Sequence, residues 1–210
     1  LQGIMSACAD AYFADLPEKV MKRFTFRDWL KRDNIHVQQE KFALRAEHET
    51  QLLRIAGHVT GRTEFDRKAA LRMHPSMQYH SMNETMRSNF YEGETWNEEN
   101  CQPHRIFVSQ GNYPLKGLHK VLEALPLIRE MYPDVTVHVA GDVITAHGTW
   151  KEKLKISSYG KYLLDLMKRN QCTGQVTFLG KLDAEQMKQE YLQANVFVSA
   201  SSMENSSNPI

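Results

Sequence analysis

The chain has 210 residues, 41% of them hydrophobic and 24% charged, which is an ordinary composition for a globular protein with one or two buried cores. Its formal net charge of +1 gives no electrostatic footprint for nucleic acid, so we expect no nucleic-acid partner. No apolar run approaches the ~20 residues of a membrane span, and the first residues lack the pattern of a signal peptide, so we expect a cytoplasmic protein.

The first half of the chain predicts mostly helices. We expect a short helix over Ser6–Phe13, one or two amphipathic surface helices between Arg27 and Gly57, and a helix over Glu64–Met73 that Thr63 caps. Two short β-like runs, His58–Gly61 and Met77–His80, flank that last helix. The stretch Asn83–Gln102 is polar, acidic and without periodicity, which is typical of a linker between domains.

After Pro103 the pattern changes to strands and helices in alternation. The predicted strands are Ile106–Val108, Val135–Ala140, Val176–Leu179 and Val196–Ser199, and the predicted helices are Gly117–Tyr132, Tyr159–Asn170 and Ala184–Ala194. The strands are almost continuously apolar, which predicts a parallel sheet buried on both faces. Pro126 should kink or split its helix, and Asp183 with Gln186 resembles a capping box.

Ligands of such a sheet bind beyond the carboxyl ends of the strands. Three segments should converge there, namely Ser109–Lys116, Gly141–Asp142 and Ser201–Asn208. We therefore predict that Ser109, Lys116, Gly141 and Glu204 lie along a single edge of one sheet.

The segment that follows the first of these strands suggests a phosphate site. It combines a glycine-bearing loop, Lys116 and the start of a helix, so backbone N–H groups and a full positive charge point at one place. The spacing of a Walker A loop is absent, and an ordinary surface loop with a solvated lysine is the alternative. Glu204 has two interpretations as well, because its carboxylate can accept hydrogen bonds from sugar hydroxyls or lie solvated in a Ser/Asn-rich turn.

Taken together, the segments carry a family resemblance. The runs VSQGNYPLKGLHKVLEALPLI, YPDVTVHVAGD, YGKYLLDLMKRN, VTFLGKL and YLQANVFVSASSMENSSNP resemble the donor domain of family-4 retaining glycosyltransferases of the GT-B fold. The upstream HVTGRTEFDR and YHSMNETMRSNFY resemble the end of the acceptor domain and the linker in a bacterial branch of that family. The resemblance implies an α/β protein of two Rossmann-like domains, the first incomplete and the second a doubly wound parallel sheet.

The resemblance also implies boundaries. Residues 1–88 would belong to the acceptor domain, 89–103 to the interdomain linker and 104–210 to the nucleotide-sugar donor domain, so the chain resembles an internal fragment of a longer enzyme. The family's second glutamate, separated from the first by seven residues, would follow Ile210. The reaction site would lie between the domains, with a hinge at Asn83–Pro103.

The implied activity is transfer of a sugar, of the hexosyl type, from a nucleotide-sugar donor to a hydroxyl of a carbohydrate or other acceptor, with retention of configuration. Glu204 matches the catalytic glutamate that faces the transferred sugar, and Lys116 matches the lysine on the donor diphosphate. The remaining donor-binding residues would be Ser109, Gln110, Gly111, Gly141, Asn205, Ser206, Ser207 and Asn208. No metal and no other cofactor is expected, and peripheral contact with a membrane stays open.

Gln110 departs from the family pattern. The family often has an arginine at this position, and glutamine can donate a hydrogen bond but supplies no charge. This departure motivates a second interpretation, a non-catalytic module that binds a nucleotide or sugar on the same fold. A third is a phosphate-binding regulatory domain of flavodoxin-like topology.

Overall fold

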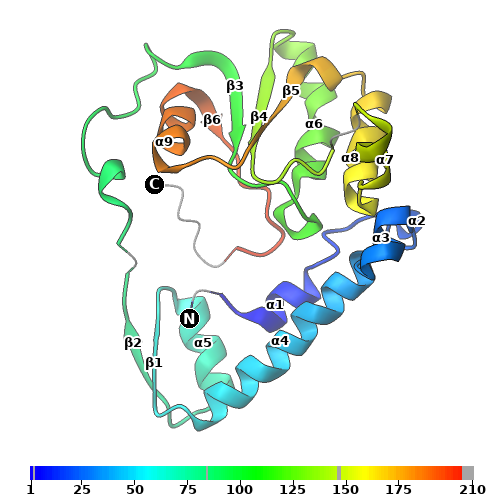
Figure 1. The fold of residues 1–210 in the computed structure, drawn as a ribbon. Coiled ribbons are helices and arrows are strands. Elements are labelled where there is room, and N and C mark those ends of the chain that lie inside the picture. The colour runs from blue at the N-terminus through cyan, green and yellow to red at the C-terminus, as the bar shows by residue number, and fades with distance from the viewer. Residues whose placement is uncertain (2, 84, 146–147, 205–210) are drawn as a thin grey trace.

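The computed structural model describes residues 1, 3–83, 85–145 and 148–204 of the chain. The main sheet has four strands. Figure 1 shows this sheet and its helices at one end of the molecule and a small helix-and-strand unit at the other end. The long helix α4 joins the two, running from the corner beside α8 down to the small unit. The linker between β2 and β3 makes a second connection.

The N-terminal helices are α1 (Met5–Asp10), α2 (Glu18–Met21), α3 (Phe26–Lys31) and α4 (Ile35–Ile55). α1 ends three residues earlier than expected, and α2 was not predicted. The sequence predicted one or two helices between Arg27 and Gly57, and the structure has two. They are separate because Arg32 takes a left-handed conformation with φ of 47°. The Asn34 side chain then accepts a hydrogen bond from the Val37 amide and starts α4.

The small unit consists of β1 (His58–Gly61), α5 (Glu64–Met73) and β2 (Gln78–Ser81), close to the sequence prediction. The two strands pair in parallel, as the crossover through α5 requires. Thr63 caps α5 as expected, since its hydroxyl accepts from the Asp66 amide. The linker that follows contains a single 3₁₀ turn (Ser88–Phe90) among its described residues.

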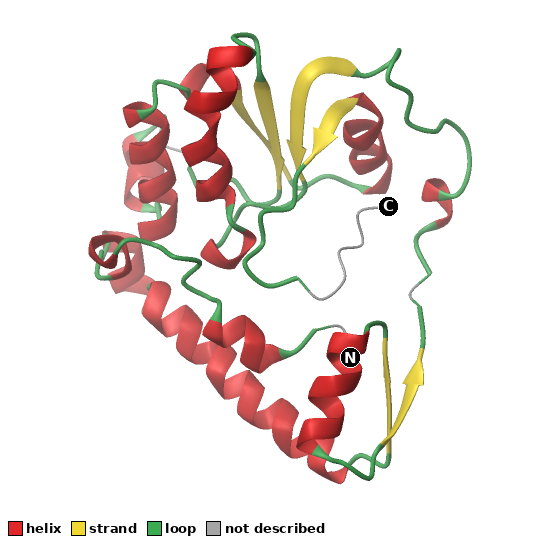
Figure 2. Ribbon diagram, turned by 180° about the vertical axis from the view of Figure 1, so that it is seen from behind, coloured by secondary structure: helices red, strands yellow, loops and turns green. Residues whose placement is uncertain are grey.

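The main sheet is parallel throughout, with strand order β5-β4-β3-β6. Its elements are β3 (Gln102–Val108), α6 (Leu118–Met131), β4 (Thr136–Ala140), α7 (Trp150–Leu154), α8 (Ser158–Arg169), β5 (Val176–Gly180), α9 (Ala184–Gln193) and β6 (Ala194–Phe197). Figures 1 and 2 show α6 and α8 on one face and α9 on the other, so the sheet is doubly wound as predicted. The Asp183–Gln186 capping box is present at the start of α9.

The expectation that all four strands are buried on both faces was wrong. β3 and β4 lie in the centre of the sheet and are mostly buried, whereas β5 and β6 lie at its edges and are partly exposed. β6 also begins and ends two residues earlier than expected. Its last ladder bond runs from the Val198 amide to the Phe107 carbonyl, 2.9 Å apart, after which the chain leaves the sheet.

The main hydrophobic core lies between the sheet and helices α6 and α8. Phe107, Tyr191 and their neighbours form a smaller core beneath α9. Three residues of the N-terminal segment, Tyr12, Leu16 and Val20, belong to the main core and are almost fully buried there. The N-terminal segment therefore packs on the same core as the sheet, and the domain boundaries implied by the resemblance stay a prediction.

Pro126 does not split its helix, contrary to one of the two expected outcomes. α6 runs unbroken from Leu118 to Met131 with Pro126 inside it. A proline has no N–H, so the carbonyl of Leu122, four residues earlier, loses its helical partner. The side chain of Asn170, just after α8, donates to that carbonyl at 2.8 Å and replaces the missing bond.

A buried histidine ties the N-terminal segment to α6. The His119 side chain is 1% exposed, its Nε2 donates to the Ala14 carbonyl at 2.9 Å, and its Nδ1 accepts from the Tyr159 hydroxyl at 3.1 Å. Ala14 has a left-handed φ of 51°, so this bond holds a turn that alanine adopts rarely. Burial lowers the pKa of His119, because the charged ring would lose its hydration.

This histidine predicts that acid destabilises the fold. Because the pKa of His119 is lower in the folded state than its ordinary value of ~6.5, the unfolded chain binds the proton more readily. The stability that neutral His119 contributes should be complete at pH values above ~6.5. It should decrease as the pH falls from there through the lower pKa of the folded state. Thermal melts between pH 5 and 8 should show a weaker acid dependence for His119→Leu than for the wild type, although the variant is less stable at pH 8. If the melting temperatures of the variant and the wild type fell equally with pH, His119 would not be the cause of the acid destabilisation.

A second prediction concerns the bond that replaces the one lost at Pro126. Asn170→Ala should leave the Leu122 carbonyl without its donor and cost about 1–3 kcal/mol of the free energy of unfolding. Pro126→Ala restores an N–H at the correct place, so it should recover part of that loss in the Asn170→Ala background. A denaturant double-mutant cycle measures the coupling, and strictly additive effects would show that Asn170 does not serve Pro126.

Candidate functional site

The residues predicted for the site gather at the carboxyl edge of the sheet. Since β3 pairs in parallel with both β4 and β6, the segments after these three strands leave from the same edge. Ser109, Gln110, Lys116 and Glu204 line one cavity of about 110 Å³ there. Gly141 leaves β4 at the same edge, and a Cβ placed on it would lie 3.9 Å from Cγ of Gln110. The predicted arrangement of Ser109, Lys116, Gly141 and Glu204 along one edge is confirmed.

A 3₁₀ turn, Pro114–Lys116, positions the lysine just before α6. The amide of Lys116 donates to the Tyr113 carbonyl at 3.1 Å, and the amide of Gly117 donates to the Pro114 carbonyl at 2.8 Å. The chain then enters α6 through Gly117, which has a left-handed φ of 70°. Lys116 therefore stands at the N-terminal end of a fourteen-residue helix, where the helix dipole is positive.

Two backbone contacts join this turn to the segment after β6. The Ser202 amide donates to the Leu115 carbonyl at 2.9 Å. Gly117 approaches the same segment so closely that a Cβ on it would lie 1.9 Å from the Ala200 carbonyl oxygen. Only glycine fits such a contact, so Gly117 holds the two loops together. The sequence singled out Lys116 beside Gly117, but this role depends on a contact between residues far apart in the chain.

The contact places a lysine and a glutamate opposite each other. Nζ of Lys116 lies 3.3 Å from Oε2 of Glu204, and the two side chains are 21% and 33% exposed. An ammonium group has three N–H donors, so Lys116 can bind an anionic oxygen without losing Glu204. The carboxylate has a second oxygen, which can accept a hydrogen bond from a hydroxyl. The cavity thus presents one anion-binding group and one hydroxyl-binding group side by side.

Gly111 does not line this cavity. It is buried, and a Cβ on it would lie 2.6 Å from Leu118 and 2.9 Å from Val139. The structure therefore gives Gly111 a packing function between the loop, α6 and β4. The remaining predicted residues, Asn205, Ser206, Ser207 and Asn208, lie outside the described residues.

A larger hollow of about 460 Å³ adjoins the cavity and shares Ser109 with it. Its walls come from the linker and from α9, and include Arg87, Phe90, Leu182 and Tyr191. Burial raises the pKa of the Tyr191 hydroxyl, and a hydrogen bond with Ser109 opposes this shift. The sequence did not identify these residues, because an aromatic residue in a linker and one on a helix show no shared pattern.

The first helix borders the site on another side. The thiol of Cys8 on α1 has a raised pKa, mainly because it is half-buried and also because Glu49 and Glu204 lie near it, while Lys116 acts in the opposite direction. A raised pKa disfavours the thiolate, which is the reactive form of a cysteine. Among the described residues, no group of three or more His, Cys, Asp or Glu side chains is arranged to hold a metal ion.

The chain matches the family model described as glycosyl transferases group 1 over residues 96–207, which is more than half of its length. No curated protein matches. The matching solved structures include sucrose-phosphate synthase from Thermosynechococcus elongatus, with 15% identity and a TM-score of 0.56 over 99% of this chain and 44% of that one. Anabaena HepE, solved with UDP and glucose, has 17% identity and a TM-score of 0.55 over 74% of this chain and 41% of that one.

S. aureus TarM, solved as a mutant with fondaparinux, α-GlcNAc-glycerol and UDP, has 13% identity and a TM-score of 0.55 over 74% of this chain and 28% of that one. The chain thus spans less than half the length of the solved structures it resembles. At such low identities the likeness shows the fold alone, and that fold is GT-B. The parallel sheet, the cavity at its carboxyl edge and the family match together place this chain in the group 1 family of glycosyltransferases.

Proposed function

We propose that the protein to which this chain belongs transfers a sugar from a nucleotide-sugar donor to a hydroxyl of a carbohydrate or another acceptor, with retention of configuration, as a family-4 enzyme. The observation that carries the proposal is the pair Lys116 and Glu204, 3.3 Å apart in a cavity at the carboxyl edge of the sheet. Both residues lie within the region that matches the family model. The UDP bound in HepE and TarM supports a nucleotide sugar as donor.

The two hollows around Ser109 suggest how the donor is divided. The smaller one holds the lysine and the glutamate, which suits a diphosphate and the sugar attached to it. The larger one is partly apolar and has the aromatic rings of Phe90 and Tyr191 in its walls, which suits a base. Because Ser109 belongs to both, the base would lie on the α9 side and the sugar beside Glu204.

Lys116 would act on the leaving group. Breaking the bond between the sugar and the nucleoside diphosphate leaves negative charge on a phosphate oxygen. The Lys116 ammonium and the positive end of α6 stand ready for that charge, so they stabilise the transition state more than the ground state. The proposal assigns this task to the protein and expects no metal. Glu204 would bind hydroxyls of the transferred sugar and face its reacting carbon.

A binding module without catalysis is the second candidate function. Gln110 lines the cavity where the family often has an arginine, so Lys116 is the only side-chain cation among its described lining residues. With full-length protein and a panel of nucleotide sugars, release of nucleoside diphosphate and NMR of the anomeric configuration in the product test the proposal. Tight binding without release favours the binding module, and an inverted product would contradict retention.

Replacement of Lys116 in the full-length protein tests its charge. Loss of one preorganised charge typically costs ~3–4 kcal/mol, so Lys116→Ala should reduce turnover by ~10²–10³. Lys116→Arg should retain part of the turnover, because the positive charge is kept but is placed at a different position. Gln110→Arg should raise donor affinity if the cavity has room. Lys120→Ala is the matched control, since Lys120 pairs with Asp15 outside the cavity and its loss should leave turnover unchanged. Folded Lys116→Ala with wild-type kinetics would remove Lys116 from the site.

The close approach at Gly117 gives a further prediction. Gly117→Ala forces a left-handed conformation that costs about 1 kcal/mol, and its methyl group would overlap the Ala200 carbonyl. The two loops should separate, and the affinity for a nucleoside diphosphate should fall at least ~10-fold, because Lys116 and Glu204 no longer act on one ligand. Gly174→Ala is the control, since nothing lies within 4 Å of the added methyl group. Calorimetric titration with UDP measures the affinity of both variants. If Gly117→Ala and Gly174→Ala bind UDP equally well, the contact between Gly117 and Ala200 does not position the site.

A further inference from the structure

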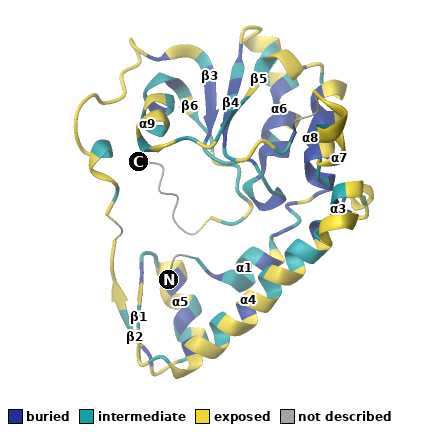
Figure 3. Ribbon diagram, viewed as in Figure 1, coloured by how far each residue is buried: buried dark blue, intermediate teal, exposed yellow. Residues whose placement is uncertain are grey.

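Two short helices present large apolar side chains to solvent. On α3, Phe26, Trp29 and Leu30 are 54%, 63% and 66% exposed, and Phe24 just before the helix is 55% exposed. On α7, Trp150 and Leu154 are 67% and 42% exposed. We call these six residues the apolar corner. Figure 3 shows α3 and α7 with exposed residues at one corner of the molecule. Arg27 of α3 and Glu152 of α7 both line one hollow.

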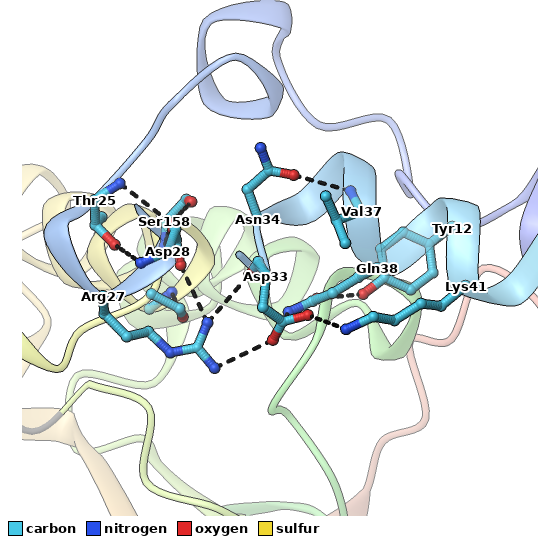
Figure 4. A network of polar contacts seen from close by, with 12 residues as sticks. Tyr12, Thr25, Arg27, Asp28, Asp33, Asn34, Val37, Gln38, Lys41 and Ser158 are labelled. Carbon is cyan, nitrogen blue, oxygen red and sulfur yellow. Dashed lines mark hydrogen bonds and ion pairs between the residues drawn. The ribbon is translucent and has the colours of Figure 1, made fainter. Parts of the chain in front are cut away.

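The orientation of α3 is the reverse of that of an ordinary surface helix. Its buried residue is a carboxylate, Asp28, and its exposed residues are aromatic and aliphatic. Oδ2 of Asp28 accepts from the Ser158 amide at 3.0 Å, from the Ser158 hydroxyl and from the Thr25 amide at 3.2 Å (Figure 4). Arg27 pairs with the other carboxylate oxygen at 3.1 Å.

These bonds hold the helix in place. Rotating α3 to bury Trp29 would break both bonds from Ser158 to Asp28, and a carboxylate that loses its partners is far more costly than an exposed indole. The fold therefore maintains the exposure of the apolar corner. Exposed apolar patches that are held in this way mark surfaces that contact something else.

The charges around the apolar corner indicate what that contact is. Between Glu18 and Asp33 the sequence has six basic and three acidic residues, and between Trp150 and Lys155 three basic residues and one acidic residue. Lys22, Arg23 and Arg27 form ion pairs with acidic residues of this chain, whereas Lys31 and Arg32 at the end of α3 are exposed. The whole chain has a net charge of +1, so the rest of it is net acidic. Lysine is depleted in protein–protein interfaces, whereas lysine and arginine around tryptophan and phenylalanine suit the boundary between anionic headgroups and acyl chains.

We propose that the apolar corner binds the surface of a membrane that contains anionic lipids. The aromatic side chains of α3 and α7 enter the boundary between headgroups and acyl chains, and the surrounding lysines and arginines contact the headgroups. No helix among the described residues is long and apolar enough to span a membrane. Neither α3 nor α7 contributes a described lining residue to the two hollows around Ser109, so the proposal stands independently of the donor site.

The test uses the full-length protein and two vesicle compositions, phosphatidylcholine alone and phosphatidylcholine with phosphatidylserine. The wild type should sediment with the mixed vesicles, and less so as salt is added. Phe26→Glu with Trp29→Glu should lower the partition coefficient at least ~10-fold. Lys31→Gln with Arg32→Gln should lower it about 30-fold, because each basic group near the surface contributes about 1 kcal/mol.

Two matched control variants show whether vesicle binding depends on the apolar corner or on any exposed apolar side chain. Ile55→Glu on α4 and Met131→Glu on α6 replace side chains that are 82% and 74% exposed, and both should bind mixed vesicles like the wild type. Circular dichroism checks folding, and UDP affinity should be unchanged in every variant. If the glutamate pair at Phe26 and Trp29 melts early, the Lys31 and Arg32 variant decides, since both side chains are exposed.

A second readout locates the contact. Brominated lipids should quench the tryptophan fluorescence of the wild type and of the Trp96→Phe variant. They should quench it less in the double variant Trp29→Phe with Trp150→Phe, in which phenylalanine keeps the apolar character of the apolar corner. Failure of the wild type to bind mixed vesicles would overturn the proposal, and so would equal binding by all variants. Concentration-dependent dimerisation that Trp29→Glu abolishes, without vesicle binding, would overturn it in favour of a second copy of the chain.

Discussion

The parallel register of the central strands is the constraint on which the site depends. β3 pairs with β4 on one side and with β6 on the other, so three loops from distant parts of the sequence leave from one edge. The register alone brings the loops to within several ångströms of each other. The contact of Gly117 with Ala200 and the bond from Ser202 to Leu115 then join two of them. Backbone groups make both contacts, so the joining of the two loops does not depend on side-chain rotamers.

The electrostatics of the cavity follow from this assembly. Lys116 and Glu204 lie 88 positions apart in the chain and meet as a partly exposed pair. Such a pair contributes little to the stability of a protein, because water screens its attraction. In the proposed function this pair acts chemically, since a diphosphate and a sugar hydroxyl need an ammonium and a carboxylate at neighbouring positions. A ligand that carries both groups would find them already oriented.

The N-terminal segment shows how polar contacts shape a surface. His119 holds the turn at Ala14 against α6, and Asp28 holds α3 against the start of α8. Both side chains are buried with their hydrogen-bonding groups satisfied, so each holds one orientation of its neighbour. The same bonds that fix α3 keep Phe26 and Trp29 in solvent. The apolar corner and the sheet that bears the cavity are therefore joined through α8.

Local pattern determined most of the secondary structure. The apolar runs, the Thr63 cap and the Asp183–Gln186 capping box act within a few residues, so the sequence alone located β1, α5, α9 and the order of strands and helices. That order also predicted the edge where Lys116 and Glu204 lie, because parallel strands end together. The sequence pattern could not separate centre strands from edge strands, since β5 and β6 are as apolar as their neighbours.

Only the tertiary structure decided features that need partners from afar. Pro126 reads as a helix breaker until Asn170 supplies the missing donor from the end of α8. Gly117 reads as a simple turn residue until the Ala200 carbonyl lies against it. Phe26 and Trp29 lie in solvent because Ser158, at the start of α8, holds the Asp28 carboxylate of their helix. In each case the deciding group is more than forty positions away in the chain, and a pattern confined to neighbouring residues carries no information about it.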